Sequence, residues 1–164
     1  MKNLIITAVA ALLTTTAAFA HDYKVGGITV MHPKAFETAK TANVGGGYMT
    51  IENTSKTADK LIAVRVAEIP RTELHLSETD ANGVARMIKQ DGVSIPAGET
   101  VMFKPGGLHV MFMGLGGDPF EVGEKIEATL VFETAGELDI VFNVEARGAD
   151  DHSGMKHTGE MKTD

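Results

Sequence analysis

Hydrophobic and polar residues alternate in short runs along most of the chain, and turn-forming residues separate the runs. Alternation with a period of two indicates strands that bury one face, while helical periodicity is weak throughout. Turn signals such as Asn82-Gly83 and Pro96-Ala97-Gly98 lie between the runs. The pattern predicts an all-β sandwich or barrel. The expected strands are Tyr23–Met31, Gly47–Asn53, Leu61–Ala67, Thr72–Thr79, Val84–Lys89, Thr100–Lys104, His109–Met113, Glu124–Glu133 and Leu138–Glu145.

The two ends of the chain depart from this pattern. Lys2, an apolar run over Leu4–Leu13 and the triplet Ala18-Phe19-Ala20 have the form of a cleavable secretory signal, residues 1–20. The apolar run is too short to span a bilayer. Residues 148–164 are polar and predict a flexible C-terminal tail. We therefore expect a periplasmic protein without a membrane anchor, whose single domain covers residues 21–147.

Composition excludes several classes of function. The net charge of −7 becomes more negative when Lys2 leaves with the signal, which disfavours binding to nucleic acid. The chain has no cysteine, so it has neither disulfides nor the thiolate that a blue-copper electron-transfer site requires. No Ser-His-Asp arrangement, phosphate-binding glycine loop or acid–base pair is evident, so we do not expect an enzyme.

Two His–Met pairs carry the most chemistry. His75 and Met87 lie on neighbouring predicted strands, and His109 and Met111 lie on a third. Imidazole and thioether together form a soft ligand set that suits Cu(I) and does not suit Mg²⁺, Ca²⁺ or Mn²⁺. A methionine on a strand is more often a core residue, so this interpretation depends on where the side chains point.

Alternation separates the His–Met residues from the core. In Thr72–Ser77 the two leucines share one face, which leaves Glu73, His75 and Ser77 on the other. In Leu108–Met113 the residues Leu108, Val110 and Phe112 form the apolar face, and His109, Met111 and Met113 project from the opposite one. Met113 is expected at a hydrophobic rim rather than as a ligand. Met31, Met49 and Met102 are expected in the core, and His32 in a turn.

Register supplies a test. His75 and Met87 share a face only where paired residue numbers add to an even total. A two-residue turn at Asn82-Gly83 would give an odd total and place them on opposite faces. The metal-site hypothesis therefore predicts an odd-length loop or a bulge between these strands.

The spacing of these residues resembles the H-(M)-x10-M-x21-H-x-M signature of the PCuAC family of periplasmic copper chaperones. Ten residues separate His75-Leu76 from Met87, and twenty-one separate Met87 from His109. The segments Val44-Gly45-Gly46-Gly47-Tyr48 and Lys104-Pro105-Gly106-Gly107 are also similar to the family. Leu76 replaces the optional second methionine, and His32-Pro33-Lys34-Ala35-Phe36 replaces the usual His-Pro-Trp-Ala-Arg. The similarity covers about residues 23–146.

The resemblance implies a cupredoxin-like Greek-key β-sandwich that binds Cu(I) through His75, Met87, His109 and Met111. It also implies delivery of copper to a respiratory oxidase copper centre, often beside a Sco-type protein. Imidazole partners among Ser94, Thr100 and Asp91 remain open. The tail residues His152, Met155, His157 and Met161 form a second candidate copper site that includes Cu(II), and His21 at the mature N-terminus is another.

Two other functions stay open on the sequence. The same ligands would serve copper sequestration in tolerance, without a dedicated acceptor. The His–Met face would also suit a metal-free β-sandwich interaction module, in which these side chains contact another protein.

Overall fold

The computed structural model describes residues 22–148, and these residues form strands and loops without any helix. The all-β prediction is confirmed. No helix long and apolar enough to cross a membrane occurs in this range. The predicted signal and nearly all of the predicted tail lie outside it, so the proposed domain boundaries stay predictions. The strands are β1 (Tyr23–Val25), β2 (Ile28–Phe36), β3 (Val44–Asn53), β4 (Asp59–Arg65), β5 (Arg71–Thr79), β6 (Ala85–Gln90), β7 (Val93–Ile95), β8 (Thr100–Phe103), β9 (Leu108–Met113), β10 (Lys125–Phe132) and β11 (Gly136–Glu145).

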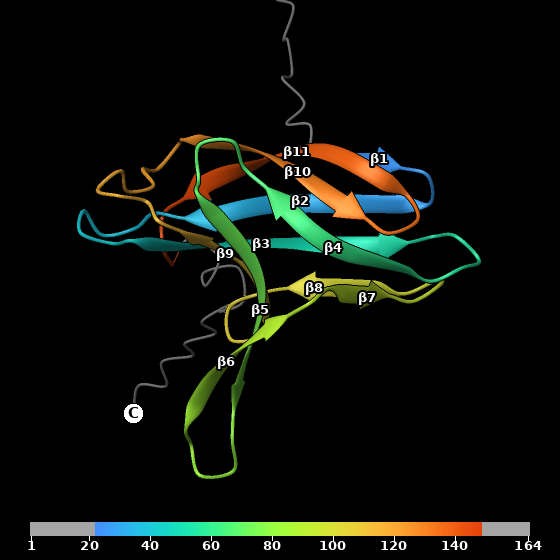
Figure 1. Cartoon of the computed structure of the whole chain (residues 1–164), viewed down its shortest axis with the longest axis horizontal. Helices are drawn as coiled ribbons and strands as arrows, with labels where there is room; N and C mark the ends of the chain where they lie inside the picture. Colours follow the sequence, from blue (N-terminus) through green and yellow to red (C-terminus); the bar gives the residue numbers. More distant parts are fainter. Residues whose placement is uncertain (1–21, 149–164) are drawn as a thin grey trace, which may run out of the picture.

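The strands form one sheet that curls into two layers. Its order is β6-β5-β9-β8-β3-β2-β11-β10-β4-β7, with β1 added beside β2 and a second pairing between β9 and β3. In Figure 1, β4 crosses in front of β2 and β3, and the end of β10 lies in front of β2. Large apolar side chains fill the space between the layers, among them Ile51, Leu61, Phe112, Leu130 and Phe142, all fully or nearly fully buried.

Alternation places the two faces as expected. Leu74 of β5 and Val110 and Phe112 of β9 belong to the core. The residues that alternate with them on each strand therefore point away from the core. Gly47 allows the strands to close tightly, because a Cβ there would meet the ring of Phe112 at 2.8 Å. The outer face of β5 and β9 is therefore the one that carries the His–Met residues.

Several predicted elements differ in detail. The expected strand Tyr23–Met31 is two strands, because Gly26 adopts a φ of 55° in a tight turn. The register of β2 then shifts at His32, which has a φ of 50°, so this residue sits in a bulge rather than a metal site. The sequence reading missed β7. Met49 is buried as expected, but the prediction of a buried Met102 was wrong, because its side chain is 55% exposed.

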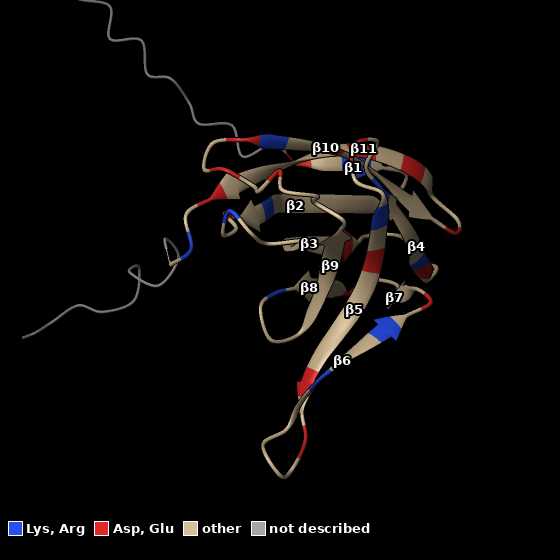
Figure 2. Ribbon diagram, turned by 60° about the vertical axis from the view of Figure 1, so that its left-hand side comes forward, with Lys and Arg blue, Asp and Glu red and all other residues tan. Residues whose placement is uncertain are grey.

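The β5–β6 hairpin extends from the body of the sandwich (Figures 1 and 2). Its strands pair Ser77 with Met87 and His75 with Lys89, so His75 and Met87 face the same side. The connection from Thr79 to Ala85 is the odd-length loop that the hypothesis requires, not a two-residue turn.

The side chain of Asp80 holds this loop together. Its Oδ1 accepts hydrogen bonds from the backbone N–H groups of Asn82 and Val84, at 2.9 and 3.0 Å. Its Oδ2 pairs with Arg86 at 3.3 Å. Gly83 supplies the positive φ of 80° that the loop needs.

Candidate metal centre

The antiparallel pairing of β5 with β9 brings the two histidines directly opposite one another. His75 is the register partner of His109, and their ring centroids lie 5.9 Å apart. Both are nearly buried, with exposed fractions of 9% and 6%. A nitrogen–metal bond of about 2.0–2.1 Å puts an imidazole centroid roughly 3 Å from the ion. The separation of the two rings is therefore compatible with a shared metal ion.

Hydrogen bonds select one nitrogen of each ring. The Nε2–H of His75 donates to Oε2 of Glu73 at 2.8 Å, and the Nδ1–H of His109 donates to the carbonyl oxygen of Gly107 at 3.0 Å. A neutral imidazole protonated on one nitrogen has its lone pair on the other. The remaining donors are Nδ1 of His75 and Nε2 of His109. The Nδ1 atom of His75 is buried and has no hydrogen-bond partner, as expected for an atom that binds a ligand.

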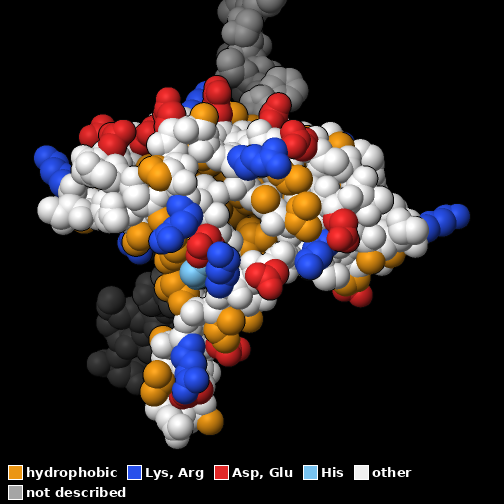
Figure 3. Space-filling model, in the orientation of Figure 1, with side chains coloured by type: hydrophobic (Ala, Val, Ile, Leu, Met, Phe, Trp, Pro, Cys, Tyr) orange, Lys and Arg blue, Asp and Glu red, His pale blue; other side chains and the backbone are white. Residues whose placement is uncertain are grey.

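Glu73 is the residue that the sequence analysis did not assign. Its carboxylate contacts His75, and its second oxygen lies 3.1 Å from Nζ of Lys89 and 3.9 Å from Nε of Arg71. The hydrogen bond from His75 lowers the pKa of Glu73, and the hydrogen bond from Lys89 lowers it further. The carboxylate thus stays ionised and fixes the orientation of His75. Figure 3 shows a histidine among acidic and basic side chains at the root of the hairpin.

The position of Glu73 in the sequence could have indicated its contact with His75. Glu73 lies two residues before His75 and therefore on the same face of the strand. Ser94 lies instead in β7, paired with Lys60, and Thr100 pairs with Glu52. Neither these residues nor Asp91 makes the imidazole contact that Glu73 makes.

Met111 lies beside the histidine pair. It follows His109 by two residues on β9, its register partner is Glu73, and its side chain is partly buried. Met113 projects from the same face, but its sulfur accepts a hydrogen bond of 3.1 Å from Nε of Arg71. This contact supports the expectation that Met113 is not a ligand.

Met87 is further away than the other three candidates. It pairs with Ser77, one step outward along the hairpin from His75, and is 56% exposed. On a flat sheet its Cα would lie about 8 Å from that of His75 and about 16 Å from that of Met111. The fold thus brings His75, His109 and Met111 together and places Met87 on the same face but at its edge.

The chemistry of this group is specific. Among residues 22–148, no three side chains from His, Cys, Asp and Glu form a group able to hold a metal ion. The histidine pair has thioethers on the same face, and thioether ligands favour Cu(I). The other candidate ligands His21, His152, Met155, His157 and Met161 lie outside the described residues.

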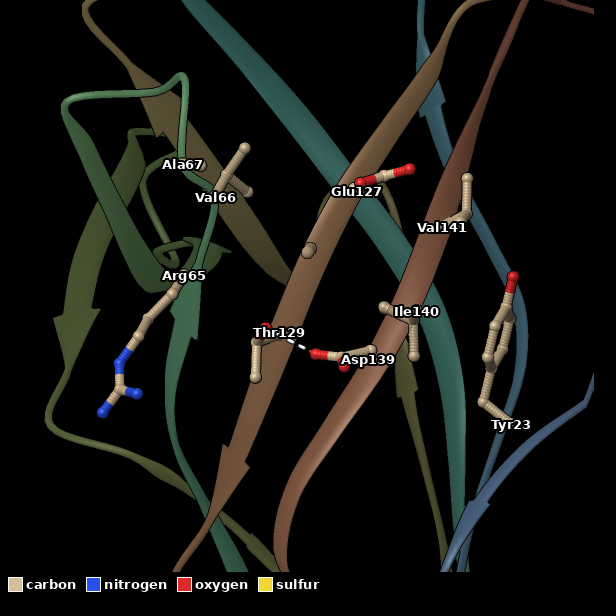
Figure 4. Close-up of a pocket in the computed structure, with 10 residues that line it drawn as sticks. Tyr23, Arg65, Val66, Ala67, Glu127, Thr129, Asp139, Ile140 and Val141 are labelled. Atoms are coloured by element: carbon tan, nitrogen blue, oxygen red, sulfur yellow. Dashed lines mark hydrogen bonds between the residues drawn. The ribbon is translucent and has the colours of Figure 1, made fainter.

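A hollow elsewhere on the sandwich has no soft metal ligands. It measures about 630 Å³ and lies over β10 and β11, with Tyr23, Arg65 and Glu127 in its wall (Figure 4). Asp139 accepts a hydrogen bond there from Thr129 at 2.7 Å. No histidine or methionine lines it, so it is not a candidate for soft-metal binding.

Comparison with known proteins identifies related chains. A family model described as "Putative lipoprotein LpqE-like" matches residues 28–144. The apo PCuAC domain from PmoF1 is 31% identical, with a TM-score of 0.67 over 77% of this chain and 99% of that one. The copper-bound PCuAC domain from PmoF2 is 32% identical, with a TM-score of 0.63 over 77% and 98% of the two chains. Apo-DR1885 from Deinococcus radiodurans is 26% identical, with a TM-score of 0.56 over 89% and 97%.

A curated relative from Leifsonia xyli subsp. xyli, "Putative lipoprotein Lxx21020", is 30% identical over 99 residues. That match spans 60% of this chain and 59% of the relative. The structural matches confirm the expected cupredoxin-like sandwich.

Proposed function

The chain belongs to the PCuAC family, and on that premise we propose that it is a periplasmic carrier that binds Cu(I) and delivers it to a copper protein. The observation that carries the proposal is the buried, unpartnered Nδ1 of His75 directly opposite His109. The copper-bound state of the PmoF2 domain supports copper as the cargo.

The proposed ligands are Nδ1 of His75, Nε2 of His109 and the sulfurs of Met111 and Met87. The first three are held on the body of the sandwich, whereas Met87 is on the projecting hairpin. Coordination by all four ligands requires the projecting hairpin to bend toward the histidine pair when copper binds, which would bring the exposed sulfur of Met87 to the ion. Met87 would then be the last ligand to bind and the first to leave.

This division suits transfer of the ion. A closed set of ligands on rigid elements is typical of structural metal sites. Here one thioether is exposed, so a partner's ligand can replace Met87 before the other three release the copper. The acceptor that fits the family resemblance is the copper-site subunit of a respiratory oxidase, with or without a Sco-type protein.

The route of export is also part of the proposal. The signal over residues 1–20 would carry the chain to the periplasm, where cleavage would leave His21 at the N-terminus. The matched family and the curated relative are both described as lipoproteins. These 164 residues contain no cysteine, so attachment of a lipid through a thiol is not available within them.

A transfer experiment tests the function. Purified protein loaded with Cu(I) is mixed anaerobically with the metal-free copper-site subunit of the oxidase, and the copper centre is followed by its absorption. We expect transfer from the native protein and faster transfer from a Met87→Leu variant, because the partner's ligand then has no sulfur to displace and the ion is held less tightly. No transfer, together with loss of copper tolerance but not of oxidase activity in a deletion strain, would indicate sequestration instead. A protein that binds no Cu(I) would indicate the metal-free interaction module.

The second copper site at the tail stays a proposal of the same kind. Deletion of residues 149–164 should lower the number of copper ions bound without removing the tightly bound Cu(I). An unchanged copper stoichiometry would exclude His152, Met155, His157 and Met161 as ligands.

A further inference from the structure

The outer face of β2, β3 and β8 carries an apolar groove beside the metal centre. Its volume is about 770 Å³. Phe36 and Tyr48 form part of the wall, with ring centroids 5.4 Å apart. Met102, the register partner of Thr50, also lines the groove and is 55% exposed. A strand residue of this size is usually covered, so the groove offers an apolar surface that a ligand can bury.

Basic side chains surround this apolar surface. Lys34, Lys104 and Arg147 all line the groove, although the chain as a whole has a net charge of −7. The Nζ of Lys34 lies 5.5 Å above the ring of Phe36 and 3.6 Å from Oε2 of Glu145. The combination favours an occupant that has carboxylates at one end and apolar side chains further along.

The chain itself leaves the sandwich in the wall of this groove. Arg147 is held by a hydrogen bond of 3.3 Å from its backbone N–H to Oε1 of Glu37, and the N–H of Glu37 bonds to the carbonyl of Glu145 at 2.9 Å. Gly148, the last described residue, lines the groove and has a φ of 97°. The sequence then continues as Ala149-Asp150-Asp151-His152, so two carboxylates directly follow the basic rim.

We propose that residues 149–164 bind in this groove of their own chain. Asp150 and Asp151 pair with Lys104 and Arg147, and Met155 packs against Tyr48 and Met102. Eight residues with the dimensions of a random coil span a root-mean-square distance of about 15 Å, a length sufficient for Met155 to reach the apolar wall. A short tether gives an effective concentration on the order of millimolar, so weak contacts are sufficient.

The groove adjoins the metal centre through β3. The hydroxyl of Tyr48 lies over Gly46, 2.7 Å from where a Cβ on that glycine would be, and Gly46 is the register partner of Met111. A segment in the groove would thus bring His152 and Met155 over β3, the strand that neighbours β9 with its proposed copper ligands. The docking itself does not require copper, so it is tested on the metal-free protein.

The absence of cysteine makes a spin-label experiment clean. A Ser153→Cys variant of the full chain, labelled with a nitroxide, is compared with its reduced form by methyl NMR. We expect several-fold paramagnetic broadening of the Met102 methyl signal and little at Ile62, which is on β4 in the other layer. Lys104→Glu in the same labelled chain should remove the broadening, and adding Asp151→Lys should restore it.

Three outcomes would overturn the proposal. Equal, weak broadening at Met102 and Ile62 would show that the tail does not occupy the groove. Broadening that persists in the Lys104→Glu variant and at high salt would show that charge pairing does not hold the tail in the groove. Broadening of an isotope-labelled, spin-free chain by a second, spin-labelled chain would show that the tail binds another copy. A parallel Cu(I) titration of each variant separates these results from a failure of the copper site.

Discussion

The four proposed ligands differ in how well the fold orients their side chains before copper binds. His75 and His109 are held by hydrogen bonds to Glu73 and to the carbonyl of Gly107, each of which leaves one defined ring nitrogen for the metal. Met111 is next to them on β9. Met87 must be ordered when it binds, and ordering a methionine side chain costs up to about 1.5–2 kcal/mol.

Because of this difference, substitution of the two methionines should lower the Cu(I) affinity by unequal amounts. We expect Met111→Leu to lower the Cu(I) affinity by about 100-fold or more, and Met87→Leu by roughly tenfold, about 1.4 kcal/mol. Leucine keeps the volume and removes only the sulfur. Met113→Leu is the matched control, because its sulfur is bound to Arg71, and it should leave the affinity unchanged. Competition with a Cu(I) chelator measures all three, and a larger loss at Met87 than at Met111 would contradict the assignment.

Glu73 should affect copper binding without touching the metal. Glu73→Gln weakens the hold on the His75 ring, and loss of such a partner typically lowers metal affinity 10–100-fold. Glu78→Gln, on the same strand but the opposite face, is the control. Equal affinities for the native protein and Glu73→Gln, measured by the same chelator competition, would mean that the carboxylate only stabilises the sheet.

The same carboxylate predicts a dependence of stability on pH. The pKa of Glu73 is lowered in the fold by His75 and Lys89, so folding favours the ionised form. Its contribution is present above the ordinary carboxyl pKa and is lost as the pH falls through the lowered value. Urea unfolding of the metal-free protein at pH 6 and pH 3 should show a smaller loss of stability for Glu73→Gln than for the native chain. Identical losses would contradict the pKa shift.

At the level of elements, the β5–β6 hairpin decides where Met87 lies. The sequence allowed only a conditional prediction of register, that a shared face for His75 and Met87 requires an odd-length loop or a bulge, and the structure has the odd-length loop. The loop conformation was not predictable, since it depends on the Asp80 carboxylate reaching two backbone N–H groups and Arg86. The short strand β7 was missed because three residues show too little alternation.

Asp80 offers a test of the hairpin's part in binding. Asp80→Ala removes both acceptor contacts and the ion pair, so the loop should become less ordered and the Cu(I) affinity should fall several-fold. Asp80→Asn keeps an acceptor oxygen and serves as the control. Loss of affinity in both variants, or in neither, would mean that loop order does not determine the position of Met87. Chelator competition, with hydrogen exchange at Val84 as a measure of loop order, distinguishes these results.

At the level of the whole molecule, the two faces of the curled sheet have separate tasks. The inner face supplies stability through residues such as Val110 and Phe112, and the outer face carries the His–Met residues. Alternation alone predicted this division. It could not predict that His75 lies opposite His109 or that Met102 is exposed, because both depend on which strands become neighbours. Strand order is set by long-range packing, which one strand's sequence does not contain.

X-ray absorption at the copper edge, on protein loaded with one equivalent of Cu(I), tests the proposed ligand set by identifying the atoms bound to the ion. We expect nitrogen and sulfur scatterers in equal number in the native protein, and loss of one sulfur in Met111→Leu and one in Met87→Leu. Coordination by nitrogen and oxygen alone, or a spectrum unchanged by either substitution, would contradict the proposed copper site.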